Sequence, residues 1–362
     1  MNKTLNYFCE NYTSNTLAGT SVQSYFTPQG KLAAYAFYKP FSAGEFDYSF
    51  LFTNTVDSTY SDGSLTKCND PCGEWKIFDC KVIICNDVNA ALNGSYDKSK
   101  EFVLTFRGSP EKKVLPNETF YTDSAKLNVT ENEYICIKTV FEGKNIPCHI
   151  ENKILTYSDD GNGVKADKYV PLPSMIGVKR HVKKKIAFWG DSITQGIGCK
   201  EDSYAHYTAV CAEILGNEYS FWNLGIGFGR AADAATNGAW ADKVKTCDTV
   251  IVCFGVNDLY KIGDYEKIKT SYDRIIGILK GKRVIFQTIP PFDYPDNLCE
   301  IYLKLNDYIR KELSKKVYAV FDETPYLSDS ENPFAAKYGG HPDEIGCKLW
   351  GERLADFLRD KI

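Results

Sequence analysis

The run Ile186-Ala187-Phe188-Trp189-Gly190-Asp191-Ser192 decides the fold of the second half of this 362-residue chain. Four apolar residues in succession are typical of a strand buried on both faces, and the glycine that follows permits a tight turn. A serine directly after such a strand lies at the rim of a sheet, where its hydroxyl can be exposed. Because Asp-Ser before a helix is equally an ordinary N-cap, the run alone leaves a chemical and a structural interpretation open.

Strands and helices alternate on the C-terminal side of this run. We expect further strands over residues 219–222, 249–254, 283–287 and 317–320, and helices over residues 204–215, 265–279, 298–313 and 342–361. Alternation of this kind predicts a parallel sheet with helices on both faces. In such sheets ligands bind at the carboxyl ends of the strands, which is where Ser192 falls.

The residues before the run have a different pattern of apolar and polar side chains. From about residue 32 to 141, apolar and polar residues alternate in short runs separated by Gly, Pro, Asn and Asp, which is typical of a β-sandwich or jelly roll, and we expect no amphipathic helix there. The basic run at residues 179–185 indicates a solvated linker rather than an anion site. We therefore predict an all-β domain over residues 1–180 and an α/β domain over residues 181–362.

Composition restricts the partners. The formal net charge of -4 argues against a nucleic-acid partner, which would need a basic face, so a small neutral substrate is expected. No apolar stretch reaches the roughly 20 residues of a membrane helix, which predicts no membrane partner, and the N-terminus shows no signal peptide, so we expect a cytoplasmic protein. The sequence does not indicate an oligomeric state.

The cysteines favour a reduced protein without a bound metal. Thirteen of them are scattered through predicted strands and helices, as expected for small core residues rather than for a disulfide framework. Cys68 and Cys72 could hold a metal or pair with each other, but no second pair of ligands complements them. We therefore predict neither a metal nor an organic cofactor.

Two further side chains at predicted strand ends could act with Ser192. A serine hydroxyl is a weak nucleophile unless a base accepts its proton, and His341 follows the fifth strand, on the rim expected to face Ser192. Asn257 follows the third strand and could donate to an oxyanion, although Asn-Asp is also common in turns. The other histidines lie in the β-rich half, the basic linker and a predicted helix: His149, His181 and His206.

The order of three blocks resembles the SGNH (GDSL-type) hydrolases. Gly190-Asp191-Ser192-Ile193 is similar to the first block of that family, Gly255-Val256-Asn257-Asp258 to the third, and His341-Pro342 with Gly346 to the last. The resemblance covers about residues 184–362 and implies a flavodoxin-like three-layer α/β/α fold. It implies that Ser192 is the nucleophile of an acyl-enzyme pathway, that His341 is the general base and then the general acid, and that the Ser192 amide and the Asn257 side chain stabilise the oxyanion.

Two blocks depart from the family pattern. The second block normally supplies a glycine backbone amide to the oxyanion hole; its usual position here is Phe228, and we favour Gly227, with Gly229 next. An aspartate normally stands three residues before the histidine, where this chain has Tyr338. Asp343, Glu344 or a backbone carbonyl could orient His341 instead, so the third member of the triad is left unassigned.

The first half also resembles a known arrangement. Residues 102–108, 114–119 and 121–123 are similar to the β-sandwich that precedes the catalytic domain in some bacterial SGNH carbohydrate esterases. This implies a carbohydrate ester substrate, and we expect hydrolysis of a small acyl ester, an acetyl group on a sugar. Four aromatic residues could stack on a sugar, although a core position explains each of them more simply: Tyr60, Trp75, Trp222 and Trp240.

Three alternatives remain. Lipid esters or acyl thioesters could be the substrates in place of sugar esters. A carbohydrate-binding or scaffolding protein with a decayed hydrolase domain is supported by Tyr338 alone, and Ser192, Asn257 and His341 are all present against it. A nucleotide-binding protein is disfavoured because the first strand is not followed by a Gly-x-Gly-x-x-Gly phosphate cradle.

Overall fold

The chain divides into two compact units. In the computed structural model, which describes residues 2–58 and 67–362, unit 1 comprises Met1–Asp57 and Asn69–His181, and unit 2 comprises Ser58–Cys68 and Val182–Ile362. The division into domains of residues 1–180 and 181–362 stays a prediction. The sequence carried no signal that Ser58–Cys68, which interrupts the β-rich half, groups with the C-terminal unit.

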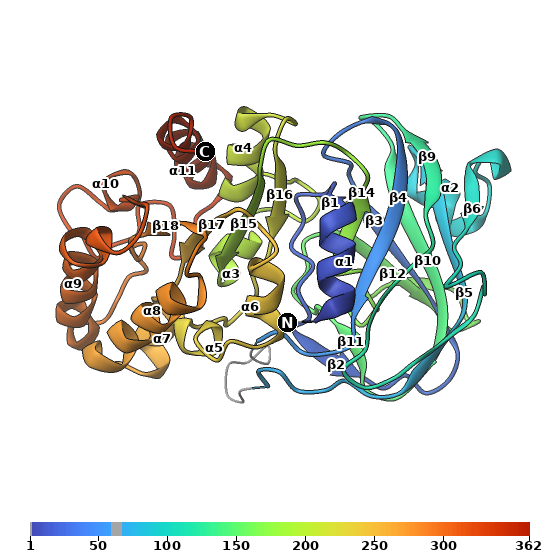
Figure 1. Ribbon diagram of the computed structural model, residues 1–362, viewed down its shortest axis with the longest axis horizontal. Coiled ribbons are helices and arrows are strands. Elements are labelled where there is room, and N and C mark those ends of the chain that lie inside the picture. The colour runs from blue at the N-terminus through green and yellow to red at the C-terminus, as the bar shows by residue number, and fades with distance from the viewer. Residues whose placement is uncertain (1, 59–66) are drawn as a thin grey trace. The chain divides into compact units, whose positions relative to one another are not determined.

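Unit 1 consists mainly of two antiparallel sheets (Figure 1). The first has the order β1 (Thr13–Ser14), β14 (Met175–Val178), β4 (Gly44–Thr53), β8 (Thr119–Tyr121), with β9 (Ala125–Val129) also paired to β4. The second has the order β13 (Val164–Ala166), β12 (Leu155–Asp159), β3 (Leu32–Tyr38), β10 (Tyr134–Gly143), β5 (Trp75–Cys85), β6 (Glu101–Val103), with β7 (Lys112–Val114) also paired to β5. A separate pair joins β2 (Ser24–Phe26) and β11 (Ile146–Cys148).

Aromatic side chains join the two sheets of unit 1. Phe120 of β8 stacks on Phe52 of β4, with ring centroids 5.2 Å apart, and its ring lies 6.2 Å from that of Trp75 on β5 of the other sheet. Trp75 is buried and donates its indole N–H to Asn54 Oδ1 at 3.0 Å. The all-β class predicted for the N-terminal half is confirmed, and Trp75 belongs to its core.

Two short helices in unit 1 accompany the sheets. They are α1 (Lys3–Asn11) and α2 (Val88–Asn93), and a 3-10 turn covers Lys98–Lys100. From the sequence we expect no amphipathic helix between residues 32 and 141, and α2, which lies there, has six residues, too few to show a helical period. Its ends do carry local signals: Asp87 accepts from the Asn89 amide, and Gly94 ends the helix with a φ of 81°.

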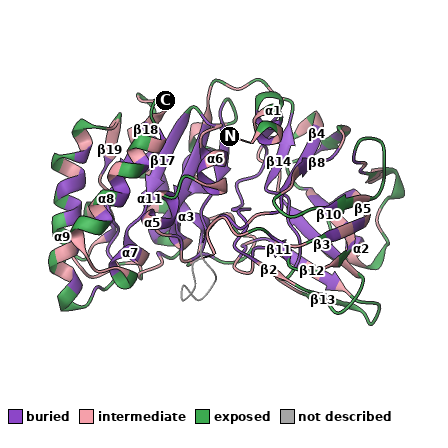
Figure 2. Cartoon of the chain, turned by 60° about the horizontal axis from the view of Figure 1, so that its bottom comes forward, coloured by how far each residue is buried: buried purple, intermediate pink, exposed green. Residues whose placement is uncertain are grey.

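Unit 2 contains a five-stranded parallel sheet. Its order is β16 (Ser220–Asn223), β15 (Lys185–Gly190), β17 (Thr249–Cys253), β18 (Arg283–Gln287), β19 (Ala319–Phe321). Counted along the chain this is the order 2-1-3-4-5, which is the doubly wound order of flavodoxin-like folds. Every residue of β16 and β17 is buried, as Figure 2 shows for the sheet interior. The predicted α/β class and its strands are confirmed.

The helices of unit 2 follow the predicted alternation. They are α3 (Ser192–Gln195), α4 (Tyr207–Leu215), α5 (Ala231–Ala234), α6 (Ala239–Val244), α7 (Val256–Lys261), α8 (Tyr265–Ile278), α9 (Asp296–Lys311), α10 (Thr324–Leu327) and α11 (Glu344–Leu358), with a 3-10 turn at Leu313–Lys315. Tyr207 of α4 stacks on Trp350 of α11 with centroids 4.0 Å apart, which fixes these two helices together. None of the helices in the described residues is long and apolar enough to cross a membrane.

Most of the candidate sugar-stacking residues belong to the core. Trp222 and Trp240 are 2% and 1% exposed, and Trp240 donates to the Leu224 carbonyl. With Trp75 they are excluded as stacking platforms, and Tyr60 lies outside the described residues.

The cysteines also serve mainly as core residues. Eleven of the thirteen are buried. Cys72 packs with Val22 and Val56 in unit 1, whereas the Sγ of Cys68 lies 3.6 Å from the Asp233 carbonyl oxygen in unit 2. Within residues 2–58 and 67–362, no group of three or more potential metal ligands is found.

Candidate active site

Ser192 is the first residue of α3, directly beyond the carboxyl end of β15. Asp191 caps this helix, since its side chain accepts from the Ile193 amide at 3.0 Å. Gly190 is required by close packing, because a Cβ there would collide with Thr194 and come within 2.6 Å of the Cys253 carbonyl oxygen on β17. The tight strand-to-helix turn therefore places the serine at the sheet rim, as the sequence predicts.

His341 meets Ser192 across this rim. The His341 Nε2 and Ser192 Oγ atoms are 2.8 Å apart. Gly198, which follows α3 and has a φ of 104°, lets its loop pack on the backbone of His341 and Pro342, since a Cβ there would lie 2.8 Å from the His341 carbonyl oxygen. Two loops that are far apart in sequence are thereby held so that a nitrogen base contacts the hydroxyl.

Neither of the two carboxylates nearest in sequence orients His341. Asp343 caps α11, accepting from the amides of Ile345 and Gly346 at 3.0 and 2.9 Å. Glu344 accepts from the Lys200 amide at 3.1 Å. Within the described part of the chain, the His341 side chain makes one hydrogen bond, to Ser192. The arrangement is therefore a serine-histidine pair without a carboxylate on Nδ1.

An aromatic ring lies against His341 instead. The Phe292 and His341 rings have centroids 5.2 Å apart and an interplanar angle of 77°. Phe292 belongs to the segment after β18, and its ring also packs against Tyr260 and Tyr294, at 5.9 and 6.2 Å. Burial lowers the pKa of His341 below its usual 6.5. Phe292 was not predicted as a site residue from the sequence. The feature that could have indicated it is its position just beyond the carboxyl end of a predicted strand.

The Asn257 side chain is directed to the loop after β16. Asn257 lies in the first turn of α7, at the end of β17, and its Nδ2 donates to the Gly229 carbonyl oxygen at 3.0 Å. A primary amide has two N–H donors, so one remains for an oxyanion. This hydrogen bond joins the third block, which contains Asn257, to the second block, which contains Gly229.

The second block forms a tight turn. The Gly229 amide donates to the Ile226 carbonyl oxygen at 3.0 Å, with Gly227 and Phe228 at the two central positions. Phe228 has a φ of 60°, a left-handed conformation that usually requires glycine. Because the Gly229 amide is engaged in this turn, Gly229 is no longer a candidate oxyanion donor. The Gly227 amide stays a prediction, with that of Phe228 beside it.

Two buried carboxyl groups hold the loops of the site through hydrogen bonds with backbone amides. Asp258 accepts from the amides of Ala231 and Ala232 at 2.8 and 3.2 Å, which ties the third block to α5. Burial raises the pKa of Asp258 to about 6 and that of Asp191 to about 7. Both side chains are engaged with backbone amides, so their part is to hold the loops in place.

Comparisons with known proteins agree with this reading of unit 2. Residues 188–349 match the GDSL-like lipase/acylhydrolase family. No curated protein matches the chain.

Several solved structures are similar to the chain. A family two carbohydrate esterase from Clostridium thermocellum is 15% identical over 97% of this chain and 97% of that one, with a TM-score of 0.41. A putative lipolytic protein of the G-D-S-L family from Desulfitobacterium hafniense is 19% identical over 48% and 99%, with a TM-score of 0.41. A carbohydrate acetylesterase from Sinorhizobium meliloti is 18% identical over 50% and 100%, with a TM-score of 0.37. These similarities are too distant to assign a substrate. The family match over residues 188–349 indicates a GDSL-like lipase/acylhydrolase domain in unit 2.

Proposed function

We propose that the protein hydrolyses small acyl esters through an acyl-enzyme formed on Ser192. The single observation that carries this proposal is the 2.8 Å contact between Ser192 Oγ and His341 Nε2 at the carboxyl edge of the sheet. A histidine whose pKa is lowered by burial is neutral at pH 7, which is the form that can accept the serine proton.

The reaction would follow two steps. In the first, Ser192 Oγ attacks the ester carbonyl while its proton passes to His341 Nε2, and His341 then protonates the leaving alcohol oxygen. In the second, a water attacks the acyl-enzyme, losing its proton to His341, which returns it to Ser192 as the acid product leaves. The Ser192 amide, the Asn257 side chain and the Gly227 amide would donate to the oxyanion in each tetrahedral intermediate. Loss of one such donor typically slows turnover about 100- to 1,000-fold.

We propose acetyl esters of carbohydrates as the substrates. The carbohydrate ester expectation comes from the two-domain resemblance, and the catalytic groups described above act on any accessible ester carbonyl. The geometry of Ser192 and His341 does not select the alcohol, so assays on several different esters identify it.

Rates on p-nitrophenyl acetate and butyrate test the proposal. We expect the wild type to hydrolyse acetate faster than butyrate, and Ser192→Ala and His341→Ala each to lose nearly all of this activity. His206→Ala is the matched control, because the His206 Nδ1 accepts from the Ala209 amide at the start of α4. Acetylated xylan and acetyl sugars, assayed alongside, test the carbohydrate assignment. A wild type no faster than Ser192→Ala on every ester would favour the non-catalytic alternative.

A further inference from the structure

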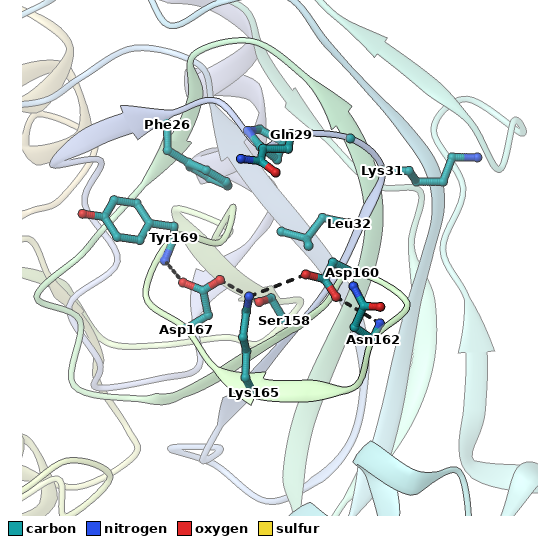
Figure 3. A pocket seen from close by; sticks show the side chains of 12 residues that line it. Phe26, Gln29, Lys31, Leu32, Ser158, Asp160, Asn162, Lys165, Asp167 and Tyr169 are labelled. Atoms are coloured by element: carbon teal, nitrogen blue, oxygen red, sulfur yellow. Dashed lines mark hydrogen bonds and ion pairs between the residues drawn. The ribbon is translucent and has the colours of Figure 1, made fainter.

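Unit 1 contains a pocket whose lining includes neither Ser192 nor His341. It has a volume of about 540 Å³, within the roughly 300–1,000 Å³ range of small-ligand sites. Two segments line it. The end of β2, the start of β3 and the connection between them supply Phe26, Leu32 and Gln29, and the β12–β13 hairpin with the residues after it supplies the opposite side (Figure 3). All of its lining residues belong to unit 1.

One end of the pocket is aromatic. The Phe26 and Tyr169 rings have centroids 5.8 Å apart and are tilted by 59° to each other. Tyr169 is 48% exposed, whereas the tryptophans of the chain are core residues. An exposed ring face offers an apolar surface to a ligand at little entropic cost, because an aromatic side chain has few rotatable bonds.

The other end is polar and held in place. Asp167 accepts from Ser158 Oγ at 2.6 Å and from the Tyr169 amide at 2.9 Å, so the residue that carries the aromatic platform also fixes the carboxylate. Asp160 accepts from the Asn162 amide at 3.0 Å and lies 3.6 Å from the Lys165 ammonium. Each carboxylate has about four acceptor positions, so both keep capacity for a ligand.

The charges and donors restrict the ligand class. Lys165 extends between the two carboxylates, whereas Lys31 points away and lies over the Phe78 ring at 4.0 Å (Figure 3). Two carboxylates beside one ammonium disfavour an anion, and a cation would have to displace Lys165. A ligand whose groups both donate and accept fits the mixture of carboxylate, ammonium and the Gln29 amide.

We propose that this pocket binds a neutral saccharide, with the apolar face of a sugar ring on Tyr169 and its hydroxyls toward Asp160 and Asp167. This gives the protein a carbohydrate-binding site in unit 1 in addition to the ester-cleaving site in unit 2. The proposal does not rest on the esterase activity, since it follows from the lining of unit 1 alone.

Polysaccharide affinity electrophoresis tests this site. The full chain is run through gels containing chemically deacetylated xylan or hydroxyethylcellulose, and xylohexaose and cellohexaose binding is measured by calorimetry. We expect at least one of these sugars to bind, and Tyr169→Ala and Asp167→Asn each to weaken binding by about tenfold or more. Tyr318→Ala, which removes a 53% exposed tyrosine of unit 2, is the matched control and should bind as the wild type does.

Three outcomes would overturn the proposal. They are no binding of any of these sugars at millimolar concentration, binding unchanged in Tyr169→Ala and Asp167→Asn, and binding lost equally in Tyr318→Ala. Hydrolysis of p-nitrophenyl acetate, measured on the same samples, should be equal in wild type and Tyr169→Ala. This activity reports on the Ser192–His341 site of unit 2, so failure of the pocket and failure of the esterase are distinguished.

Discussion

The contact between Ser192 and His341 lacks the carboxylate that normally completes a triad. A triad aspartate holds the imidazole in the correct tautomer and stabilises the imidazolium that forms during the reaction. Here Tyr338 stands in the usual aspartate position, and Asp343 and Glu344 bond to backbone amides instead. Burial and the Phe292 ring, with its centroid 5.2 Å from that of His341, are what the structure shows around the imidazole.

The first prediction concerns the pH dependence of hydrolysis. Because neutral His341 is the base and burial lowers its pKa, activity should persist below pH 6.5 and be lost as the pH falls further through the lowered pKa. The measurement is kcat/KM for p-nitrophenyl acetate from pH 4.5 to 8. An acidic limb with its midpoint at or above the ordinary histidine value of about 6.5 would contradict the account.

The second prediction concerns Phe292 as a positioning residue. Phe292→Ala admits water to His341, so the acidic limb should move toward higher pH, and the lost ring contact should lower kcat by about 3- to 10-fold. Phe292→Leu is the matched variant: it keeps apolar cover, so the limb should stay near that of the wild type while kcat still falls. Identical pH profiles and rates in all three proteins would show that Phe292 has no part in placing the histidine.

At the scale of elements, each active-site loop is fixed at a helix start. Asp191 caps α3, Asp343 caps α11, and Asp258 accepts from the first amides of α5. Parallel strands bring these helix starts to one edge of the sheet. Asp191 and Asp258, which lie in the first and third blocks, therefore hold loops in place. Among the described residues of the three blocks, the side chains of Ser192 and His341 contact each other.

The third prediction separates capping from catalysis in α11. Asp343→Ala removes the cap and should lower the free energy of unfolding by about 1 kcal/mol, whereas Asp343→Asn keeps an accepting oxygen and should be close to the wild type. Turnover of folded Asp343→Asn and Glu344→Gln should stay within about threefold of the wild type. Loss of a true triad aspartate costs on the order of 10,000-fold, so a drop of that size in either variant would identify the missing third member.

At the scale of the whole molecule, unit 2 is discontinuous in sequence. Ser58 donates to Asp233 Oδ2 at 3.2 Å, and the Arg230 guanidinium pairs with the same carboxylate, its Nη2 2.8 Å from Oδ1. Arg230 directly follows the second-block turn. A piece of chain from within the β-rich half is therefore bonded to the segment that carries the predicted oxyanion donor, and a cut at residue 181 would remove it from unit 2.

The fourth prediction concerns the pH dependence of stability. The pKa of Asp191 is about 7 in the folded chain against 3.8 normally, so the folded chain holds a proton that the unfolded chain has lost between about pH 4 and 7. The free energy of unfolding therefore falls as the pH rises across this window. Asp191→Asn cannot ionise and can still cap α3, so its stability relative to the wild type should improve by about 2 to 4 kcal/mol from pH 4 to 7.

Urea unfolding followed by tryptophan fluorescence measures this difference. Four of the five tryptophans lie in unit 2, so the signal reports mainly on that unit. Asp356→Asn, at an exposed position on α11, is the control and should follow the wild type at every pH. A stability difference between Asp191→Asn and the wild type that is constant from pH 4 to 7 would contradict the buried-carboxyl account.

Local patterns were enough to predict the sheet and its helices. The apolar strands of unit 2 and the helices between them follow from hydrophobic period, and the rim positions of Ser192, Asn257 and His341 follow from the parallel order. The turn at residues 226–229 was not predictable, because a phenylalanine occupies the left-handed position where glycine is usual. The part of Phe292 and the bond between Ser58 and Asp233 were also missed, because they depend on contacts between residues distant in sequence.

Covalent labelling of the serine tests the central claim most directly. Wild type, His341→Ala and His206→Ala are treated with diethyl p-nitrophenyl phosphate, and the labelled peptide is identified by mass spectrometry. We expect a single diethylphosphoryl group on Ser192 in the wild type and in His206→Ala, with labelling nearly abolished in His341→Ala. Labelling at another residue, or equal labelling of Ser192 without His341, would contradict a hydrolase that works through the Ser192–His341 pair.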